Sequence, residues 1–237
     1  MKPECYLLMD TSTKNFSLAV SRAGRVARFR NFYLDQVLSS SIIPCIDRIL
    51  KRADISFDDI SGFGVGLGPG SFTSLRVGLA TIKAFCLASG KPVAGVPSPD
   101  ILVRNVAPAA IPYAATLVDA RRDLVYACLY RATSRGWERA SPYLLTDLEA
   151  FLPRLEGDTV FLGDAVPRYA GRIQEFMESR SGPRGPRVCR WAPEKLWVPR
   201  AGRMLDLVSE RLKEGRGDAP DTLVPLYLYP EDCQVRR

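Results

Sequence analysis

The segment 64–78 contains the residues best suited to chemistry, because its glycines lie between a short apolar strand and the start of a helix. Gly68 and Gly70 could open backbone N–H groups toward a phosphate at the helix start. Alternatively, they only form a tight turn between strand and helix, which a hydroxyl of Ser71 or Thr73 would cap. The turn is the favoured interpretation, and a P-loop is excluded because its lysine and glycine spacing are missing.

The composition excludes several classes of catalytic site. The chain of 237 residues has no histidine, so histidine-based zinc sites, Ser-His or Cys-His catalysis and histidine acid–base chemistry are excluded. Its six cysteines are scattered, form no Cys-x-x-Cys pair and lie mostly in apolar runs, which favours free thiols in a reducing compartment. Neither cysteines nor carboxylates cluster as metal ligands, so we expect no metal site and no cofactor.

The charge balance is compatible with a nucleic acid partner. The formal net charge is +7, from 33 basic and 26 acidic residues. Arginines gather in two segments, namely Arg22, Arg25, Arg28 and Arg30, and Arg180, Arg184, Arg187 and Arg190. They could contact nucleic acid phosphates, although a solvated basic surface is the favoured interpretation. Because no apolar run approaches the length of a membrane span and no signal peptide is evident, we expect a cytoplasmic protein without a membrane partner.

The hydrophobic pattern of the first hundred residues predicts elements in the order β-β-β-α-β-α-β. The expected strands are 5–10, 16–21, 26–32, 63–67 and 92–96, and the expected helices are 39–53 and 71–88. The first three strands form an antiparallel meander whose third strand is half exposed, and serines 39–41 cap the first helix. In the second helix Arg76 and Lys83 are the only charges, so this helix needs a second cover, most simply a partner protein.

The second half follows a proline-rich stretch, 97–112. Its expected elements are strands at 115–119, 124–132 and 159–162, helices at 146–155, 167–178 and 201–214, a loop over 180–193 and a strand-like tail at 223–229. We therefore expect an α/β protein of two tandem halves, 1–100 and 101–237. The helix at 200–214 could pack back on the first half.

Five motifs occur in order along the chain. The most specific is Gly68-Pro69-Gly70-Ser71-Phe72-Thr73 with Leu75-Arg76-Val77-Gly78-Leu79-Ala80 after it. The others are Leu8-Met9-Asp10-Thr11-Ser12-Thr13, Ile43-Pro44-Cys45-Ile46-Asp47, Asp119-Ala120-Arg121 with Val125-Tyr126, and Pro225-Leu226-Tyr227-Leu228. Together they resemble the TsaB (YeaZ) family of the actin-like ATPase superfamily, which is related to TsaD. The resemblance covers essentially the whole chain and implies two actin-like, ribonuclease H-like halves with mixed sheets flanked by helices.

The resemblance also implies a function. The family takes part in making N6-threonylcarbamoyladenosine (t6A) at position 37 of tRNAs that read codons starting with A. Its implied role is a non-catalytic scaffold and activator of TsaD, which holds a metal through histidines and transfers the threonylcarbamoyl group. TsaD would bind through the two N-terminal helices, and the ATPase TsaE would join them. A weak or indirect contact with tRNA and a homodimer of the isolated chain stay open.

The two N-terminal helices would supply the partner interface. The residues expected there are Ile42, Cys45, Ile46 and Ile49 of the first helix, and Ser74, Val77, Gly78, Thr81 and Phe85 of the second. Gly78 would let another helix approach closely; alternatively, it would pack tightly against the sheet of its own chain.

The alternative function is a small-molecule kinase or ATPase of the actin-like type. In kinases of the superfamily the aspartate of the first hairpin helps to hold the metal–nucleotide complex. A nucleotide site would then comprise Asp10, Thr11, Ser12, Gly68 and Gly70. In the favoured interpretation Asp10 instead accepts hydrogen bonds from the turn that follows it. A metallopeptidase is a third class, and the absence of histidine argues against it.

Overall fold

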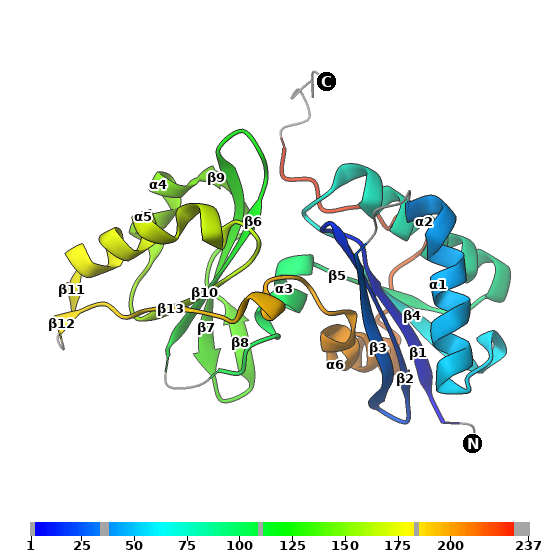
Figure 1. Cartoon of the computed structure of the whole chain (residues 1–237). Coiled ribbons are helices and arrows are strands. Elements are labelled where there is room, and N and C mark those ends of the chain that lie inside the picture. Colours follow the sequence, from blue (N-terminus) through cyan, green and yellow to red (C-terminus); the bar gives the residue numbers. More distant parts are fainter. Residues whose placement is uncertain (1–2, 34–37, 109–110, 183–184, 230–237) are drawn as a thin grey trace. The chain divides into compact units, whose positions relative to one another are not determined.

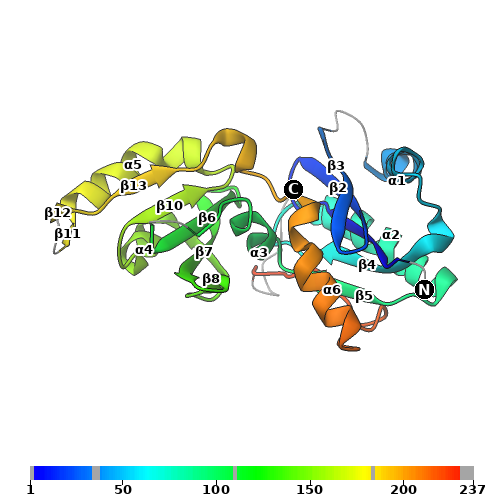
Figure 2. The same ribbon diagram turned by 90° about the horizontal axis from the view of Figure 1, so that it is seen from below.

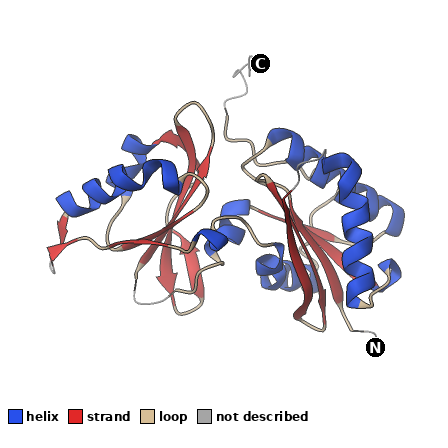
Figure 3. Ribbon diagram, viewed as in Figure 1, coloured by secondary structure: helices blue, strands red, loops and turns tan. Residues whose placement is uncertain are grey.

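The computed structural model describes residues 3–33, 38–108, 111–182 and 185–229, and the chain divides into two compact units. The first unit combines residues 1–101 with 199–226, and the second combines residues 102–198 with 227–237. Each unit has its own main β-sheet flanked by helices (Figures 1 and 3). The segment expected to form a helix over 200–214 lies within the first unit.

The first unit is built on a five-stranded sheet with the strand order β3-β2-β1-β4-β5. Its strands are β1 (Cys5–Asp10), β2 (Asn15–Arg22), β3 (Arg25–Tyr33), β4 (Ile60–Gly66) and β5 (Val93–Val96). Strands β1 to β3 form an antiparallel meander, whereas β4 pairs in parallel with β1 and β5 in parallel with β4. The predicted order of elements is thereby confirmed, and β3 is an exposed edge strand.

Helices cover both faces of this sheet (Figures 1 and 2). They are α1 (Leu38–Ala53), α2 (Phe72–Ser89) and α6 (Leu205–Lys213), with short 3-10 turns η1 (Phe57–Asp59) and η4 (Ala201–Met204). On one face Leu7 packs with Ile46 of α1 and Ile82 of α2. On the other face Leu8 packs with Val208 of α6. Because successive side chains of a strand alternate between faces, burial of both faces explains why β1 is apolar along most of its length.

The second unit contains a mixed six-stranded sheet with the order β13-β10-β6-β7-β8, and β9 also pairs with β7. Its strands are β6 (Tyr113–Asp119), β7 (Leu124–Thr133), β8 (Gly136–Arg139), β9 (Leu144–Asp147), β10 (Thr159–Leu162) and β13 (Cys189–Trp191), with a small hairpin of β11 (Ser181–Gly182) and β12 (Gly185–Pro186). Its helical segments are α4 (Leu148–Phe151), η2 (Leu152–Arg154), α5 (Val166–Ser179) and η3 (Glu194–Leu196). The unit boundary falls within α3 (Ser98–Val103). Leu117, Phe161 and Ile173 share a core under α4 and α5.

Two expectations of local structure are wrong, and one expected helix begins two residues late. The helix expected over 146–155 begins only after β9, because Asp147 caps α4 by accepting from the backbone N–H of Ala150 at 2.7 Å. The loop expected over 180–193 contains β13, an edge strand that pairs in parallel with β10. The tail at 223–229 forms no strand. Strand β13 depends on a partner far away in the sequence, whereas a local cap sets the start of α4.

The expected helix caps are also wrong. Helix α1 already begins at Leu38, so serines 39–41 lie inside it, and so does Pro44. Ser71 precedes α2, but its hydroxyl makes no bond to the helix backbone and instead shares a hydrogen bond of 2.9 Å with the Ser74 hydroxyl. The five cysteines in the described part of the chain are free thiols, whereas Cys233 and Arg184 lie outside the described residues.

Candidate functional site

Asp10, at the end of β1, is fully buried and accepts three hydrogen bonds. Its Oδ1 accepts from the backbone N–H of Ser12 at 2.9 Å and from the Ser12 hydroxyl at 2.6 Å. Its Oδ2 accepts from the Ser98 hydroxyl at 2.6 Å. The Ser98 oxygen in turn accepts from the N–H of Gly68 at 3.0 Å. A continuous set of bonds therefore connects the end of β1 with the glycine turn and the start of α3.

The glycines near Asp10 allow close contact between two segments of backbone. A Cβ at Gly70 would lie 2.0 Å from the carbonyl oxygen of Ser12, and a Cβ at Gly66 would lie 1.9 Å from Oδ2 of Asp10. The same Ser12 oxygen accepts from the N–H of Ser71 at 2.7 Å. The glycine turn and the β1–β2 hairpin thus contact each other directly, and the N–H of Gly68, which the nucleotide hypothesis would offer to a phosphate, donates to Ser98 instead.

This geometry favours the turn interpretation for Asp10. Burial raises the pKa of Asp10 above its ordinary value, and the hydrogen bonds from Ser12 and Ser98 oppose that shift. A metal ion bound by this carboxylate would compete with the hydroxyls of both serines. Among the described residues, no three His, Cys, Asp or Glu side chains come together as a metal site.

Ser98→Ala should destabilise the first unit by about 1–3 kcal/mol, because it leaves Gly68 N–H and a buried carboxylate oxygen without their partner. Urea denaturation followed by circular dichroism measures this change. The exposed Ser134 offers a matched control, since Ser134→Ala should change the free energy of unfolding by no more than about 0.5 kcal/mol. Equal midpoints for the two variants would show that the network around Asp10 contributes nothing to stability.

The β6–β7 hairpin of the second unit has no glycine at its tip. Arg121, Arg122 and Asp123 have φ angles of 63°, 51° and 61°, in the left-handed region that costs roughly 1–2 kcal/mol for each non-glycine residue. Oδ1 of Asp119 accepts from the N–H of Arg121 at 3.0 Å, and Asp123 forms an ion pair with Arg168. Both aspartates therefore stabilise the turn.

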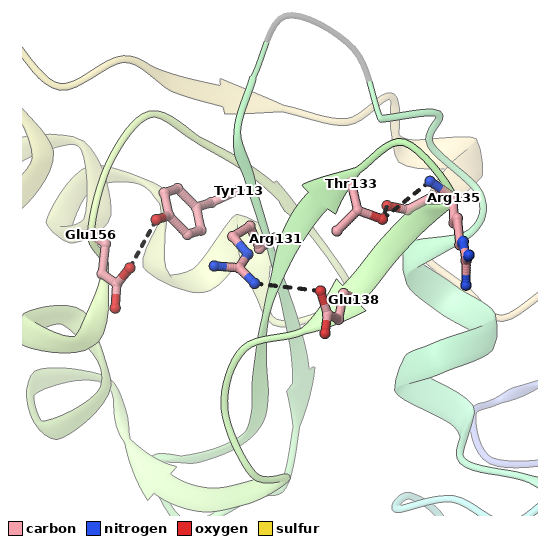
Figure 4. A network of polar contacts seen from close by, with 7 residues as sticks. Tyr113, Arg131, Thr133, Arg135, Glu138 and Glu156 are labelled. Carbon is pink, nitrogen blue, oxygen red and sulfur yellow. Dashed lines mark hydrogen bonds and ion pairs between the residues drawn. The ribbon is translucent and has the colours of Figure 1, made fainter.

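A polar network on the second unit likewise shows only structural contacts (Figure 4). The Tyr113 hydroxyl donates to Glu156 at 2.8 Å, and Arg131 of β7 lies 3.4 Å from Glu138 of β8. The bond to Glu156 raises the pKa of Tyr113 above its ordinary value.

The residues expected at a partner interface have different environments. Ile42, Cys45, Ile46 and Ile49 are buried in the core of the first unit, because the apolar stripe of α1 faces its own sheet. In this structure the four side chains pack inside their own unit, and their contact with a partner stays a prediction. Ser74, Val77, Thr81 and Phe85 are half-buried on α2.

Gly78 also faces inward. A Cβ there would lie 2.4 Å from the hydroxyl oxygen of Thr11, so the glycine allows α2 to approach the β1–β2 hairpin of its own chain. This contact agrees with the interpretation that Gly78 packs tightly within its own chain, which was the alternative to close approach by a partner helix. The Thr11 hydroxyl is buried beside it and has no hydrogen-bond partner among the described residues.

The exposed side of α2 carries small apolar residues beside Arg76 and Lys83; the sequence analysis expected uncovered apolar surface on this helix but named other residues for it. Ala80, Ala84, Leu87 and Ala88 are exposed, and we call these four residues the apolar stripe. Their spacing of three and four residues places them on one side of the helix. Leu87 is 69% exposed, and Ile43 of the neighbouring α1 is 51% exposed. The periodicity was present in the sequence, but it does not show which side of an all-round apolar helix faces out.

Helix α2 is also unusually exposed for its composition. By length and composition alone it is apolar enough to cross a membrane, and 28% of its residues are buried. Leu79, Ile82 and Cys86 pack on the sheet in the core of the first unit, as in a core helix of a soluble α/β protein. One side of α2 is therefore covered by the sheet of its own unit, whereas the apolar stripe on the other side is exposed among the described residues.

Comparisons with known proteins bear on this arrangement. A model of the family described as "TsaD: tRNA N6-adenosine threonylcarbamoyltransferase" matches residues 35–164. Two curated relatives are described as "tRNA threonylcarbamoyladenosine biosynthesis protein TsaB". The relative from Bacillus subtilis is 26% identical, and the match covers 73% of this chain and 77% of that protein. The relative from Escherichia coli is 25% identical, and the match covers 94% of this chain and 93% of that protein. A solved structure, "YeaZ from Pseudomonas aeruginosa", superposes with a TM-score of 0.74 and 22% identity over 95% of this chain and 100% of that one.

The strand orders of the two units and the likeness to the YeaZ structure confirm the α/β fold class with two mixed sheets flanked by helices.

Proposed function

We propose, from the premise that this chain belongs to the TsaB/YeaZ family and is related to TsaD, that it acts in t6A modification of tRNA. Its finer role would be that of a non-catalytic scaffold and activator of a TsaD partner. The reaction would transfer a threonylcarbamoyl group to adenosine 37 of tRNAs that read codons starting with A. The two units would correspond to the two actin-like halves of the fold, and the protein would work in the cytoplasm.

The apolar stripe of α2 is the observation that carries this proposal. An apolar helix that leaves most of its residues unburied exposes surface that water solvates poorly. Small side chains at positions 80, 84 and 88 let a partner helix approach closely, and Leu87 and Ile43 add larger apolar contacts. A TsaD partner would therefore pack on α1 and α2 through this exposed face, with the half-buried Ser74, Val77, Thr81 and Phe85 at its edge.

The chemistry of the chain supports a non-catalytic role. It has no histidine with which to hold a catalytic metal or to act as a general base near neutral pH. The buried Asp10 accepts bonds from its own chain. The catalytic groups would therefore belong to the TsaD partner, and TsaE would join the complex on a surface that we do not assign. The isolated chain could also pair with a second copy through the same helices.

Co-expression with the TsaD of the same organism tests this proposal. Size-exclusion chromatography with light scattering should show a stable complex of the two chains. Absence of a complex, with TsaD itself well folded, would contradict the scaffold role. The kinase or ATPase alternative would then be tested by ATP hydrolysis with the purified chain, and activity lost in Asp10→Ala would establish it.

A further inference from the structure

The β2–β3 hairpin and helix α1 bring six arginines to one face of the first unit. The register pairs Arg28 with Val20 and Arg30 with Leu18, and both apolar residues lie in the cluster that α1 covers. Because paired residues share a face of the sheet, these two arginines extend from the side on which α1 packs. The six residues, which we call the arginine face, are Arg22, Arg25, Arg28, Arg30, Arg48 and Arg52, and all are exposed.

Direct contacts hold the hairpin arginines against the end of the helix. Nε of Arg28 donates to the carbonyl oxygen of Arg52 at 3.1 Å. The guanidinium of Arg22 donates to the carbonyl oxygen of Asp54, just after α1. Both bonds satisfy carbonyl groups at the carboxyl end of α1, where positive charge is favourable. These two side chains are therefore anchored with part of each guanidinium still in solvent.

The positive charge of the arginine face is not neutralised by described carboxylates. No ion pair links any of the six arginines to an acidic residue in the described parts of the chain. Asp47 of α1 is paired with Lys51 at 2.8 Å. Burial raises the pKa of Cys45, and the charges of Arg48 and Arg30 oppose this shift, so the two cations lie near the same thiol. A cluster of exposed cations on one face creates a positive potential that attracts anions.

The arrangement fits an extended polyanion better than a single phosphate. Arg28 and Arg30 are two residues apart on a strand, which separates them by about 6.6 Å. Arg48 and Arg52 are four residues apart on a helix, which is a rise of about 6 Å. The cations thus form two rows over convex secondary structure. Arginine is suited to phosphates because its planar guanidinium can bind two oxygens at once and is weakly hydrated.

Two exposed rings on β3 distinguish RNA from other polyanions. Phe29 and Tyr33 are 38% and 69% exposed, and their register places them on the other face of this edge strand. A single-stranded RNA loop that passes over the edge could contact arginines with its phosphates and stack a base on Tyr33, whereas the guanidinium of Arg200 already lies 5.8 Å from the centroid of the Phe29 ring. An acidic protein surface or a lipid membrane offers the charge but has no bases to stack.

We propose that the arginine face binds the phosphate backbone of RNA, specifically the tRNA on which the complex acts. The choice of tRNA rests on the proposed function, whereas the binding of a phosphate chain rests on the arginines alone. The surface is separate from the apolar stripe. Five residues of α-helix separate Ile43 from Arg48, which places them about 140° apart around α1, so a protein partner and an RNA can bind at the same time.

Fluorescence anisotropy with a labelled tRNA transcript that reads a codon starting with A tests the proposal. The full-length protein should bind the transcript, and the logarithm of its affinity should fall with the logarithm of salt concentration with a slope of about −4 to −5 for six phosphate contacts. Arg30→Glu combined with Arg48→Glu should weaken binding at least tenfold and flatten the slope by about 2. Within the described parts of the chain neither side chain makes a hydrogen bond to the backbone, so circular dichroism should be unchanged.

The control is a second double variant, which makes the same change in charge on the second unit. Arg154→Glu combined with Arg190→Glu replaces two exposed arginines far along the chain, and it should retain wild-type affinity for tRNA. Equal loss in both double variants would overturn the proposal, because net charge alone would then explain binding. Failure of the wild type to bind tRNA, or a preference for phosphatidylserine vesicles, would overturn it too. Co-purification of the arginine variant with TsaD is measured separately, so failure of this surface and failure of the scaffold role can be told apart.

Discussion

Gly70→Ala is expected to destabilise the first unit by about 3 kcal/mol or more. The new Cβ would lie 2.0 Å from the carbonyl oxygen of Ser12 and 2.8 Å from its carbonyl carbon, and neither backbone atom can rotate away. Relief of this overlap requires the turn to move from the β1–β2 hairpin, which breaks the 2.7 Å bond between Ser71 N–H and Ser12. Overpacking of a tight site costs about 1–3 kcal/mol, and loss of a buried hydrogen bond costs a similar amount.

Calorimetry measures this effect, and the chain provides a glycine-to-alanine control. Gly171 lies inside α5 with no atom within 4 Å of an added Cβ. Gly171→Ala should therefore stabilise the protein by roughly 0.5–1 kcal/mol, because alanine is the better helix former. A Gly70→Ala protein as stable as the wild type would show that the turn can open away from Ser12. Such freedom would restore room for a phosphate and revive the nucleotide hypothesis.

Much of the architecture could be predicted from the sequence because its signals are local. The strands 5–10 and 159–162 are buried runs that end at turn residues, and both were predicted with the bounds that the structure has. Helix α2 was predicted to within one residue at its carboxyl end, where Gly90 terminates it in the left-handed conformation. Strand β13 could not be predicted in this way, because three residues at a sheet edge become a strand only by pairing with β10.

The candidate site was predicted less completely, since its contacts join distant parts of the sequence. The turn after Asp10 was expected to supply its hydrogen bonds, and Ser12 does so. Ser98 donates to the same carboxylate from 88 residues away, and no spacing rule would identify it. For α1 the periodicity showed an apolar stripe but not whether its own sheet or a partner covers it. Ile46 was therefore assigned to an interface, although the core of the first unit surrounds it.

Ala84→Glu should weaken the complex with TsaD by about 100-fold, because a carboxylate placed without a partner in an apolar interface costs roughly 3 kcal/mol. Ala84 lies in the middle of the apolar stripe and is exposed, and glutamate is a good helix former, so the isolated chain should fold as before. Val77→Glu would be a less specific test, because Val77 also packs partly against the core. Affinity is measured by titrating labelled TsaD with each variant.

Ala150→Glu is the matched control, since Ala150 is an exposed helical alanine of α4 in the second unit. This variant should bind TsaD as tightly as the wild type does. If Ala84→Glu also bound normally, the exposed side of α2 would not contact TsaD, and the apolar stripe would need another cover. If Ala84→Glu lost TsaD but kept the tRNA affinity of the wild type, the apolar stripe and the arginine face would act as independent surfaces. That independence follows from their positions, because the stripe is on α2 whereas the arginines extend from β2, β3 and the far side of α1.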